Sequence, residues 1–334
     1  MPSSDEFVPY AQRPEWSDVQ PVAQDDGPEP VAVIRYPPFF EDVHGYFRAV
    51  QQSGEFSQRV MELTADVIEH NSANYTAWYY RRRCLKELGL DLAAELEFTD
   101  QWAADSPKNY QVWYHRRWLI AEIAAGIAAQ KSADVAEAEI AELARRELQY
   151  HQEVMQRNDD FKNYNGWSHR QFIVRQFKLW DGELDFILEL LDDDIRNNSA
   201  WNHRYTVVKN LHWPFSRETI QSEVDFTLGM LEQCYTNESA WNYLSAFTGD
   251  GEGKRPLTEF PAVEALCLKI IAESGSRLEL ARFAIETLAL VHEARGETQQ
   301  AVERYGELKR VDKIRVCYWD WRIACLQHIA APTQ

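Results

Sequence analysis

Two short turns in this sequence carry a lysine immediately before an Asn-Tyr pair, an arrangement suited to holding an anion. They are Lys108-Asn109-Tyr110 and Lys162-Asn163-Tyr164. Each pair begins a segment with helical spacing of its apolar residues. The free backbone N–H groups and the positive end of the helix dipole would therefore face the same anion as the lysine. Ordinary solvated turns are the competing interpretation, so the two turns indicate a candidate site without identifying its ligand.

Other residues that could do chemistry favour structural roles. His115, His169 and His203 occupy the same place, just before an arginine, in three copies of one pattern. No acidic or cysteine partner recurs with them at metal-ligand spacing, so packing or hydrogen bonding is expected rather than ligation. The glycine-rich segment 249–254 lacks the four-residue gap and the Ser or Thr of a phosphate-binding loop. The sequence therefore predicts no metal site in this chain.

Both turns belong to a repeated pattern, Asn-x-x-x-Trp-x-x-Arg. The tryptophans of its five copies are Trp78, Trp113, Trp167, Trp201 and Trp241, at intervals of 35, 54, 34 and 40 residues. The fifth copy lacks the arginine. A period in the mid-thirties is typical of the helix–turn–helix unit of an α-solenoid. The long interval contains an insertion rich in Ala and Glu at about 121–146, which we expect to lengthen two facing helices or their connection.

The pattern predicts an all-α fold. Within each of the first four copies, the Trp, the Arg three residues later and an apolar residue at the seventh position share one face of a helix. The Asn falls where a short polar side chain can cap that helix. The recurring Trp, Asn and Arg are therefore expected to fill the core and to tie one turn to the next.

Composition limits the class of protein. Among 334 residues, 53 acidic side chains oppose 35 basic ones, a net charge of −18 that argues against nucleic-acid binding. We expect neither a signal peptide nor stable insertion into a membrane. The five cysteines are scattered, which favours reduced thiols in the cytoplasm. Residues 1–36, rich in Pro and acidic side chains, are expected to form a mobile N-terminal arm, and residues 37–330 a helical-hairpin repeat domain.

The short segments around the repeated positions resemble those of a known family. The run 106–117, Ser-Pro-Lys-Asn-Tyr-Gln-Val-Trp-Tyr-His-Arg-Arg, is similar to the second repeat of the α subunit shared by protein farnesyltransferase and type I geranylgeranyltransferase. Segments 46–50, 74–82, 196–202 and 237–243 also resemble it. The resemblance covers about residues 39–319. It implies a crescent-shaped α-α superhelix of tetratricopeptide-like helical hairpins, wrapped around a β subunit that holds zinc, the lipid cavity and most of the peptide site.

The resemblance also implies roles for individual residues. Lys108 matches the lysine that contacts the diphosphate, and Gln111 matches the glutamine that hydrogen-bonds the terminal carboxylate of the substrate peptide. Tyr110, Asn163 and Tyr164 match residues along the same edge. At Asn165 the sequence departs from the mammalian-type pattern, which has histidine, and this puts a role for that position in doubt.

The implied activity is transfer of farnesyl or geranylgeranyl from its diphosphate to the cysteine of a C-terminal CaaX motif, as in small GTPases. Zinc would be held by the β subunit, of farnesyltransferase and of type I geranylgeranyltransferase, and magnesium would assist. Two alternatives stay open, the α subunit of the geranylgeranyltransferase that acts on Rab proteins and a non-catalytic helical-repeat scaffold. The first usually carries added domains in animals, and the second gives no reason for Lys-Asn-Tyr-Gln in one particular repeat.

Overall fold

A computed structural model describes residues 8–330 of the chain, and this part divides into two compact units, residues 1–179 and 180–334. Each unit is described by itself. The described residues form helices and turns without a strand, apart from one isolated bridge between Thr248 and Arg255. The prediction of an all-α fold built from repeated helical hairpins is confirmed.

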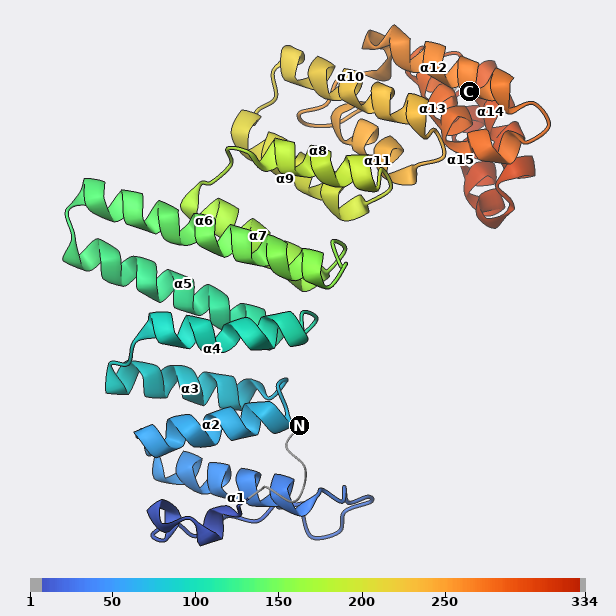
Figure 1. Cartoon of the computed structure of the whole chain (residues 1–334). Helices are drawn as coiled ribbons and strands as arrows, with labels where there is room; N and C mark the ends of the chain where they lie inside the picture. The colour runs from blue at the N-terminus through green and yellow to red at the C-terminus, as the bar shows by residue number, and fades with distance from the viewer. Residues whose placement is uncertain (1–7, 331–334) are drawn as a thin grey trace. The chain divides into compact units, whose positions relative to one another are not determined.

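The first unit consists of helices that follow one another as antiparallel pairs (Figure 1). They are α1 (Pro38–Ser53), α2 (Gln58–His70), α3 (Tyr75–Leu88), α4 (Leu92–Asp105), α5 (Tyr110–Gln130), α6 (Ala133–Arg157) and α7 (Tyr164–Phe177). Helices α3, α5 and α7 contact one another in a row, and α4 contacts α6 in a second row. The unit therefore has two helical layers.

The second unit continues the same alternation. Its helices are α8 (Glu183–Asp193), α9 (Asn198–His212), α10 (Arg217–Gln233), α11 (Glu238–Phe247), α12 (Pro261–Ser274), α13 (Arg282–Ala294), α14 (Thr298–Val311) and α15 (Val316–Ala330). Segment 315–322 keeps the Trp-x-x-Arg spacing of the repeat but lacks its asparagine. Its Trp319 is fully buried, and the indole N–H donates a hydrogen bond to Asp312 at 3.2 Å. The tryptophan position thus keeps its core role where the surrounding pattern has been lost.

The repeated asparagines start the helices. Asn109 begins α5, and its side-chain oxygen accepts a hydrogen bond from the backbone N–H of Gln111 at 2.9 Å. Asn163 caps α7 in the same way, through the N–H groups of Asn165 and Gly166. The caps of α3, α9 and α11 are Asn74, Asn197 and Asn237. Such a cap contributes about 0.5–2 kcal/mol to stability, which explains the recurrence of Asn.

The repeated tryptophans fill the core and also fix the turns. Trp113 is 1% exposed, and its indole N–H donates to the carbonyl of Pro107, six residues earlier, at 2.7 Å. That carbonyl also accepts a hydrogen bond from the Asn163 side chain of the next repeat, at 3.1 Å. The same shared acceptor recurs at Ser72 and at Ile195. The predicted tie between successive turns is therefore confirmed as one carbonyl that serves two repeats.

In the first unit, a buried glutamate joins the arginine of one repeat to the histidine of the next. Glu147 of α6 accepts two hydrogen bonds from Arg116 of α5, at 2.9 and 2.7 Å, and one from His169 of α7, at 2.7 Å. Glu95 joins Arg81 to His115 in the same manner. Burial lowers the pKa of both histidines, so they are neutral at pH 7. The histidines are thus hydrogen-bonding groups, as their repetition predicts.

The insertion at 121–146 lies in the second half of α5 and the first half of α6. These two helices are 21 and 25 residues long, against 14 for α3, α4 and α7. They extend past their neighbours at the end where they connect (Figure 1). The expectation that the insertion lengthens two facing helices is confirmed.

The expectation of a mobile N-terminal arm is wrong for residues 10–22. Tyr10 and Trp16 are 1% and 2% exposed and pack with Tyr46 of α1. The Tyr10 hydroxyl donates to Asp66 of α2 at 2.6 Å. These two large aromatic side chains offset the ordering entropy of a segment that has no helical period. Residues 1–7 of the arm lie outside the described residues, and residues 23–35 are mostly exposed.

Candidate functional site

The two lysine-bearing turns lie against each other at one edge of the first unit. The turn from α4 into α5 carries Lys108, and the turn from α6 into α7 carries Asn163. The Asn165 side chain donates a hydrogen bond to the backbone carbonyl of Lys108 at 2.8 Å, 57 residues away in sequence. The two turns are therefore neighbours in the fold.

The side-chain amides of Asn163 and Asn165 are already hydrogen-bonded within the protein. Asn163 is 3% exposed, caps α7 with its oxygen, and donates through its nitrogen to Pro107 and Asp160. Asn165 is half-buried, and its amide holds the carbonyl of Lys108. Both residues therefore hold the two turns together.

The Lys108 ammonium projects into solvent beside one carboxylate. Its side chain is 82% exposed, and Nζ lies 3.6 Å from an Asp160 carboxylate oxygen. An exposed ion pair of this kind is worth about 0–1 kcal/mol. A phosphate-bearing ligand can therefore replace Asp160 at the ammonium at little cost, because it offers charge-assisted hydrogen bonds in place of this weak ion pair.

The cavity between the turns has an acidic wall. It measures about 580 Å³ and is lined by Asp105, Ser106, Pro107, Lys108, Asn109, Asn158, Asp159 and Asp160. Three carboxylates thus oppose one ammonium. An anion held only by this chain would meet repulsion from Asp105 and Asp159. The site consequently supplies one cation to a ligand whose remaining charge must be balanced from elsewhere.

The tyrosines beside the site are exposed. Tyr110 and Tyr164 are 58% and 83% exposed at the first turns of α5 and α7. Tyr75, Tyr79 and Tyr114 are also more than half exposed on α3 and α5. Because α3, α5 and α7 contact one another, these rings lie on one row of helices, which we call the tyrosine face. Large aromatic groups in such numbers on one face mark an interaction surface.

Ion pairs and hydrogen bonds stiffen this same row of helices. Arg82 of α3 lies 5.0 Å from the ring centre of Tyr114 on α5, and Lys86 lies 2.7 Å from Glu122. Arg117 of α5 donates to the Ser168 hydroxyl of α7 at 2.9 Å. The three helices are therefore held in register along the face that carries the tyrosines.

Gln111 differs from the other candidates because its side chain is buried but not engaged. The residue is 7% exposed, and its backbone N–H is taken by the Asn109 cap. Within residues 8–330, its side-chain amide makes no hydrogen bond to another group. The amide nitrogen and oxygen are not fully buried, so water can satisfy them until a ligand takes its place. Gln111 is thus free to recognise a polar group, and as the second residue of α5 it lies three residues after Lys108.

Sequence reasoning missed the acidic partner of Lys108 and the glutamates that bind the repeated arginines and histidines. Asp160 lies two residues before Lys162 and carries no repeat signal, so its place beside Lys108 could not be read from spacing. The glutamates of the buried bridges do carry a signal. Glu95, Glu147 and Glu183 precede the repeat histidines by 20, 22 and 20 residues.

The described residues contain neither a candidate metal cluster nor a candidate membrane-spanning helix. Between residues 8 and 330, no cluster of three or more His, Cys, Asp or Glu side chains has an arrangement that could hold a metal ion. No helix in that part of the chain combines the length and the apolar character needed to cross a membrane.

Four segments match the protein prenyltransferase alpha subunit repeat, at residues 57–88, 92–123, 144–177 and 180–211. They correspond to the helix pairs α2–α3, α4–α5, α6–α7 and α8–α9. Each matched segment therefore contains one turn capped by a repeated asparagine.

Individual relatives agree with this match. A protein farnesyltransferase/geranylgeranyltransferase type-1 subunit alpha from Dictyostelium discoideum is 48% identical over 104 residues, which are 30% of this chain and 32% of the relative. One from Arabidopsis thaliana is 50% identical over 101 residues, 30% of this chain and 31% of the relative. The aligned part thus spans about a third of these curated relatives.

The fold comparison extends further along the chain. A solved structure described as Candida albicans protein geranylgeranyltransferase-I complexed with GGPP aligns with a TM-score of 0.79 and 27% identity, over 93% of this chain and 98% of that one. Four family repeats occur in order, and the fold agrees over nearly the whole length. The chain is therefore similar to protein prenyltransferase alpha subunits both in its repeats and in its fold.

Proposed function

We propose that this chain is the α subunit of a heterodimeric protein prenyltransferase. With a β subunit it transfers farnesyl, or geranylgeranyl, from the isoprenoid diphosphate to the cysteine of a C-terminal CaaX motif in the cytoplasm. The observation that carries the proposal is the edge of the first unit, where Lys108, Tyr110 and Gln111 meet the turn of the next repeat. The names of the curated relatives and of the aligned transferase support it.

The reaction forms a bond between the cysteine sulfur and C1 of the prenyl group. The bond from C1 to the diphosphate oxygen breaks, and the diphosphate leaves with the electron pair. Zinc, held in this proposal by the β subunit, would keep the cysteine ionised at neutral pH. What this chain contributes is therefore stabilisation of the leaving group and orientation of the peptide.

Lys108 is the group proposed to act on the diphosphate. Negative charge grows on the leaving oxygens in the transition state, and a cation already in place lowers the barrier without reorganisation. The exposed ammonium beside Asp160 fits this role, because the weak ion pair exchanges readily for a phosphate oxygen. The acidic wall of the turn cavity explains why the diphosphate would also need cations from the β subunit or magnesium.

Gln111 is proposed to bind the peptide's terminal carboxylate. A side-chain amide donates N–H groups to carboxylate oxygens, and this amide has no competing partner among the described residues. Tyr110 and Tyr164 would line the same edge with their exposed rings. Asn163 and Asn165 would act through the turns they hold, since their amides are occupied.

The tyrosine face is proposed as the surface that binds the β subunit. Its rings lie on the same row of helices as Gln111 and Tyr110, so a partner there would close the site from the open side. The same β-subunit surface would bury the apolar area that the face exposes. This arrangement needs no catalytic cluster in the chain itself.

Prenyl transfer to a fluorescent peptide ending in Cys-aliphatic-aliphatic-Ser tests the proposal. The chain is assayed alone and co-expressed with the β subunit of its organism, with farnesyl or geranylgeranyl diphosphate, zinc and magnesium. Turnover only in the co-expressed sample is expected. A stable complex with bound zinc but no turnover on this peptide would contradict the proposal. Turnover that requires a Rab protein would favour the Rab enzyme, and complex formation without any transfer would favour a scaffold.

A further inference from the structure

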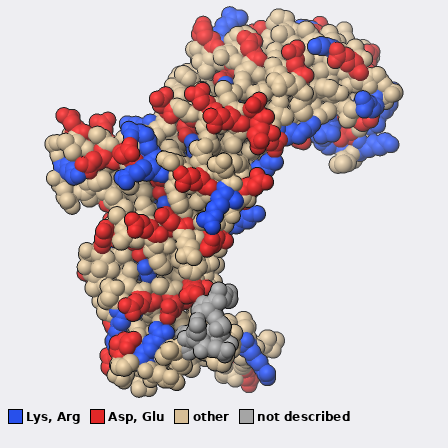
Figure 2. Space-filling model, in the orientation of Figure 1, with Lys and Arg blue, Asp and Glu red and all other residues tan. Residues whose placement is uncertain are grey.

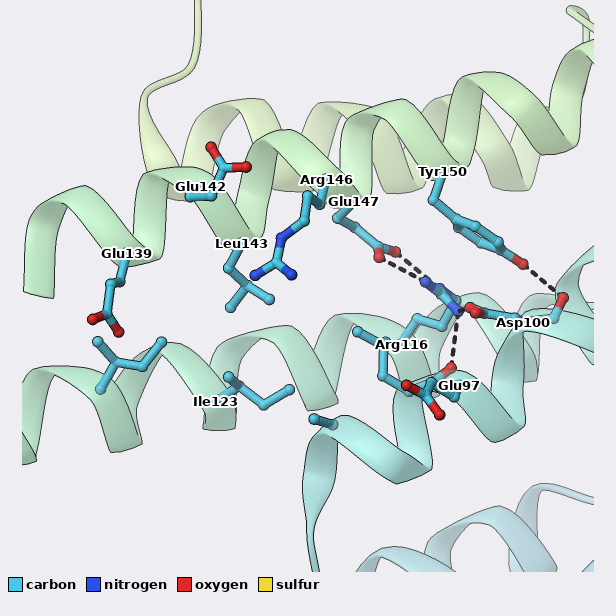
Figure 3. Close-up of a pocket in the computed structure, with 13 residues that line it drawn as sticks. Glu97, Asp100, Arg116, Ile123, Glu139, Glu142, Leu143, Arg146, Glu147 and Tyr150 are labelled. Atoms are coloured by element: carbon cyan, nitrogen blue, oxygen red, sulfur yellow. Dashed lines mark hydrogen bonds and ion pairs between the residues drawn. The ribbon is translucent and has the colours of Figure 1, made fainter.

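A second cavity lies on the other layer of the first unit, away from the turns. It measures about 460 Å³, between α4, α5 and α6, and Figure 3 shows the side chains around it. That volume is within the range of roughly 300–1,000 Å³ found for ligand sites. Its long walls are provided by the insertion in α5 and α6, to which the proposed transferase function gives no role.

The cavity faces away from the tyrosine face. Arg116, Ile123 and Ile127 of α5 line it, and their spacing of seven and four residues places them on one side of the helix. Tyr110 and Tyr114 lie on the opposite side of α5 by the same periodicity. A ligand in this cavity therefore does not compete with a partner seated on the tyrosine face.

One end of the cavity is polar and already saturated. Arg116 is 1% exposed and is bound by Glu147 and by Asp100, while its guanidinium lies 3.9 Å from the ring centre of Tyr150. The Tyr150 hydroxyl donates to the Asp100 carbonyl at 2.6 Å. This end of the cavity is therefore rigid without a ligand. Because two carboxylates neutralise Arg116, its guanidinium does not attract an anion.

The rest of the cavity combines an apolar floor with an acidic rim. Leu96, Ile123, Ile127 and Leu143 form the floor, and Glu97, Glu139 and Glu142 stand around it with one basic side chain, Arg146. Glu139 and Glu142 pair with Lys131 and Arg145 outside the cavity. Such exposed pairs are worth about 0–1 kcal/mol, so an incoming cation can replace them. The rim therefore favours a positively charged ligand.

We infer that this cavity is a docking site for a basic amphipathic segment of a partner protein, with an apolar side chain on the floor and flanking Lys or Arg side chains at Glu97, Glu139 and Glu142. Charge complementarity selects the occupant: with Arg116 neutralised, the acidic rim repels an acidic segment. The apolar floor adds the requirement for an apolar anchor, which a purely polar cation lacks.

Binding of a labelled synthetic peptide to the purified full chain tests the inference. The probe is an amphipathic peptide of roughly 15 residues made of leucine and lysine, followed by fluorescence anisotropy in about 50 mM and 500 mM NaCl. Two further peptides serve as comparisons, one with glutamate in place of lysine and one with serine in place of leucine. Only the leucine–lysine peptide is expected to bind, and more weakly at high salt.

Two variants with matched controls locate the binding. Glu97→Gln with Glu142→Gln removes two rim charges and is expected to weaken binding about tenfold at low salt. Asp134→Asn with Glu137→Gln removes the same charge from exposed positions of α6 outside the cavity and should leave binding unchanged. Ile127→Ser should weaken binding at both salt concentrations, with unchanged circular dichroism. Equal affinity of the two double variants, binding of the serine peptide as tight as the leucine peptide, or no binding at all would overturn the inference.

Discussion

The side-chain amide of Asn165 holds the backbone carbonyl of Lys108 at 2.8 Å, across the boundary between two repeats. The lysine's ammonium is free to move while its backbone is fixed from the neighbouring unit. A substrate at this edge would therefore meet a mobile ammonium group on a lysine whose backbone is held in place.

Asn165→Ala should slow catalysis more than it lowers stability. The lost hydrogen bond is worth about 0.5–1.5 kcal/mol, and the turn carrying Lys108 gains freedom. In the heterodimer we expect kcat to fall several-fold with a small change in KM, as measured by steady-state transfer to a CaaX peptide. Ser199→Ala changes the same repeat position in the second unit and should leave kcat intact. A variant that loses only thermal stability would show that Asn165 has no positioning role.

Asp160→Asn should strengthen anion binding at Lys108. The carboxylate lies 3.6 Å from the ammonium and competes with a diphosphate for it. Removal of a competitor worth about 0–1 kcal/mol predicts an increase of up to about fivefold in affinity for the prenyl diphosphate. Titration of the heterodimer with a fluorescent diphosphate analogue measures this. Asp134→Asn is the matched control, because it removes the same charge from an exposed position of α6 outside this cavity. Weaker binding in Asp160→Asn would mean that Asp160 supports the site.

Gln111→Ala should weaken peptide binding through the terminal carboxylate alone. The wild-type heterodimer is expected to prefer a free C-terminus to an amidated one, and the variant should lose about tenfold of that preference. Competition binding with the paired peptides measures it, with Gln130→Ala at the far end of α5 as the control. Unchanged discrimination between the two peptides in Gln111→Ala would remove the assigned role.

Glu147→Gln should destabilise the first unit by about 3–5 kcal/mol, because it removes the buried carboxylate that binds the Arg116 guanidinium twice and leaves only the half-exposed Asp100. Ion pairing with Arg116 and hydrogen bonds from His169 and Arg116 outweigh burial and lower the pKa of Glu147 from 4.5 to about 2. A depressed pKa stabilises the folded state above pH 4.5, by roughly 3 kcal/mol, and this contribution is lost as the pH falls toward 2.

The difference in melting temperature between wild type and Glu147→Gln should therefore shrink as the pH falls from 7 to 3. Glu142→Gln, at an exposed position of the same helix, should show little difference at either pH. A pH-independent difference would mean that Glu147 titrates normally in the fold.

The repeated positions made most of the fold predictable. The capping asparagine and the tryptophan recur in five copies, so their period can be read from the sequence. Their contacts are largely within one repeat. The buried Glu147 joins two repeats, so its role becomes visible only when α6 is placed between α5 and α7. The packing of Tyr10 rests on hydrogen bonds to residues 32 and 56 positions away, which no local pattern records.

The candidate site was predictable only in part for the same reason. Adjacent repeats bring Lys108 and Asn163 to one edge, and this follows from the period. Two other features depend on the shape of the two turns. Asp160 pairs with the Lys108 ammonium, and the Asn165 amide donates to the Lys108 carbonyl. The family resemblance assigned roles by position and could not distinguish an occupied amide from a free one.

Single-turnover transfer by the heterodimer with Lys108→Ala tests the central claim most directly, that this chain acts on the leaving group. Enzyme with bound prenyl diphosphate is mixed with excess CaaX peptide, and the thioether product is followed in time. We predict a rate about 10²–10³ times slower than wild type, with a smaller change in peptide affinity, and a normal rate for Lys131→Ala at the far end of α5. Equal single-turnover rates for Lys108→Ala and wild type would contradict the account.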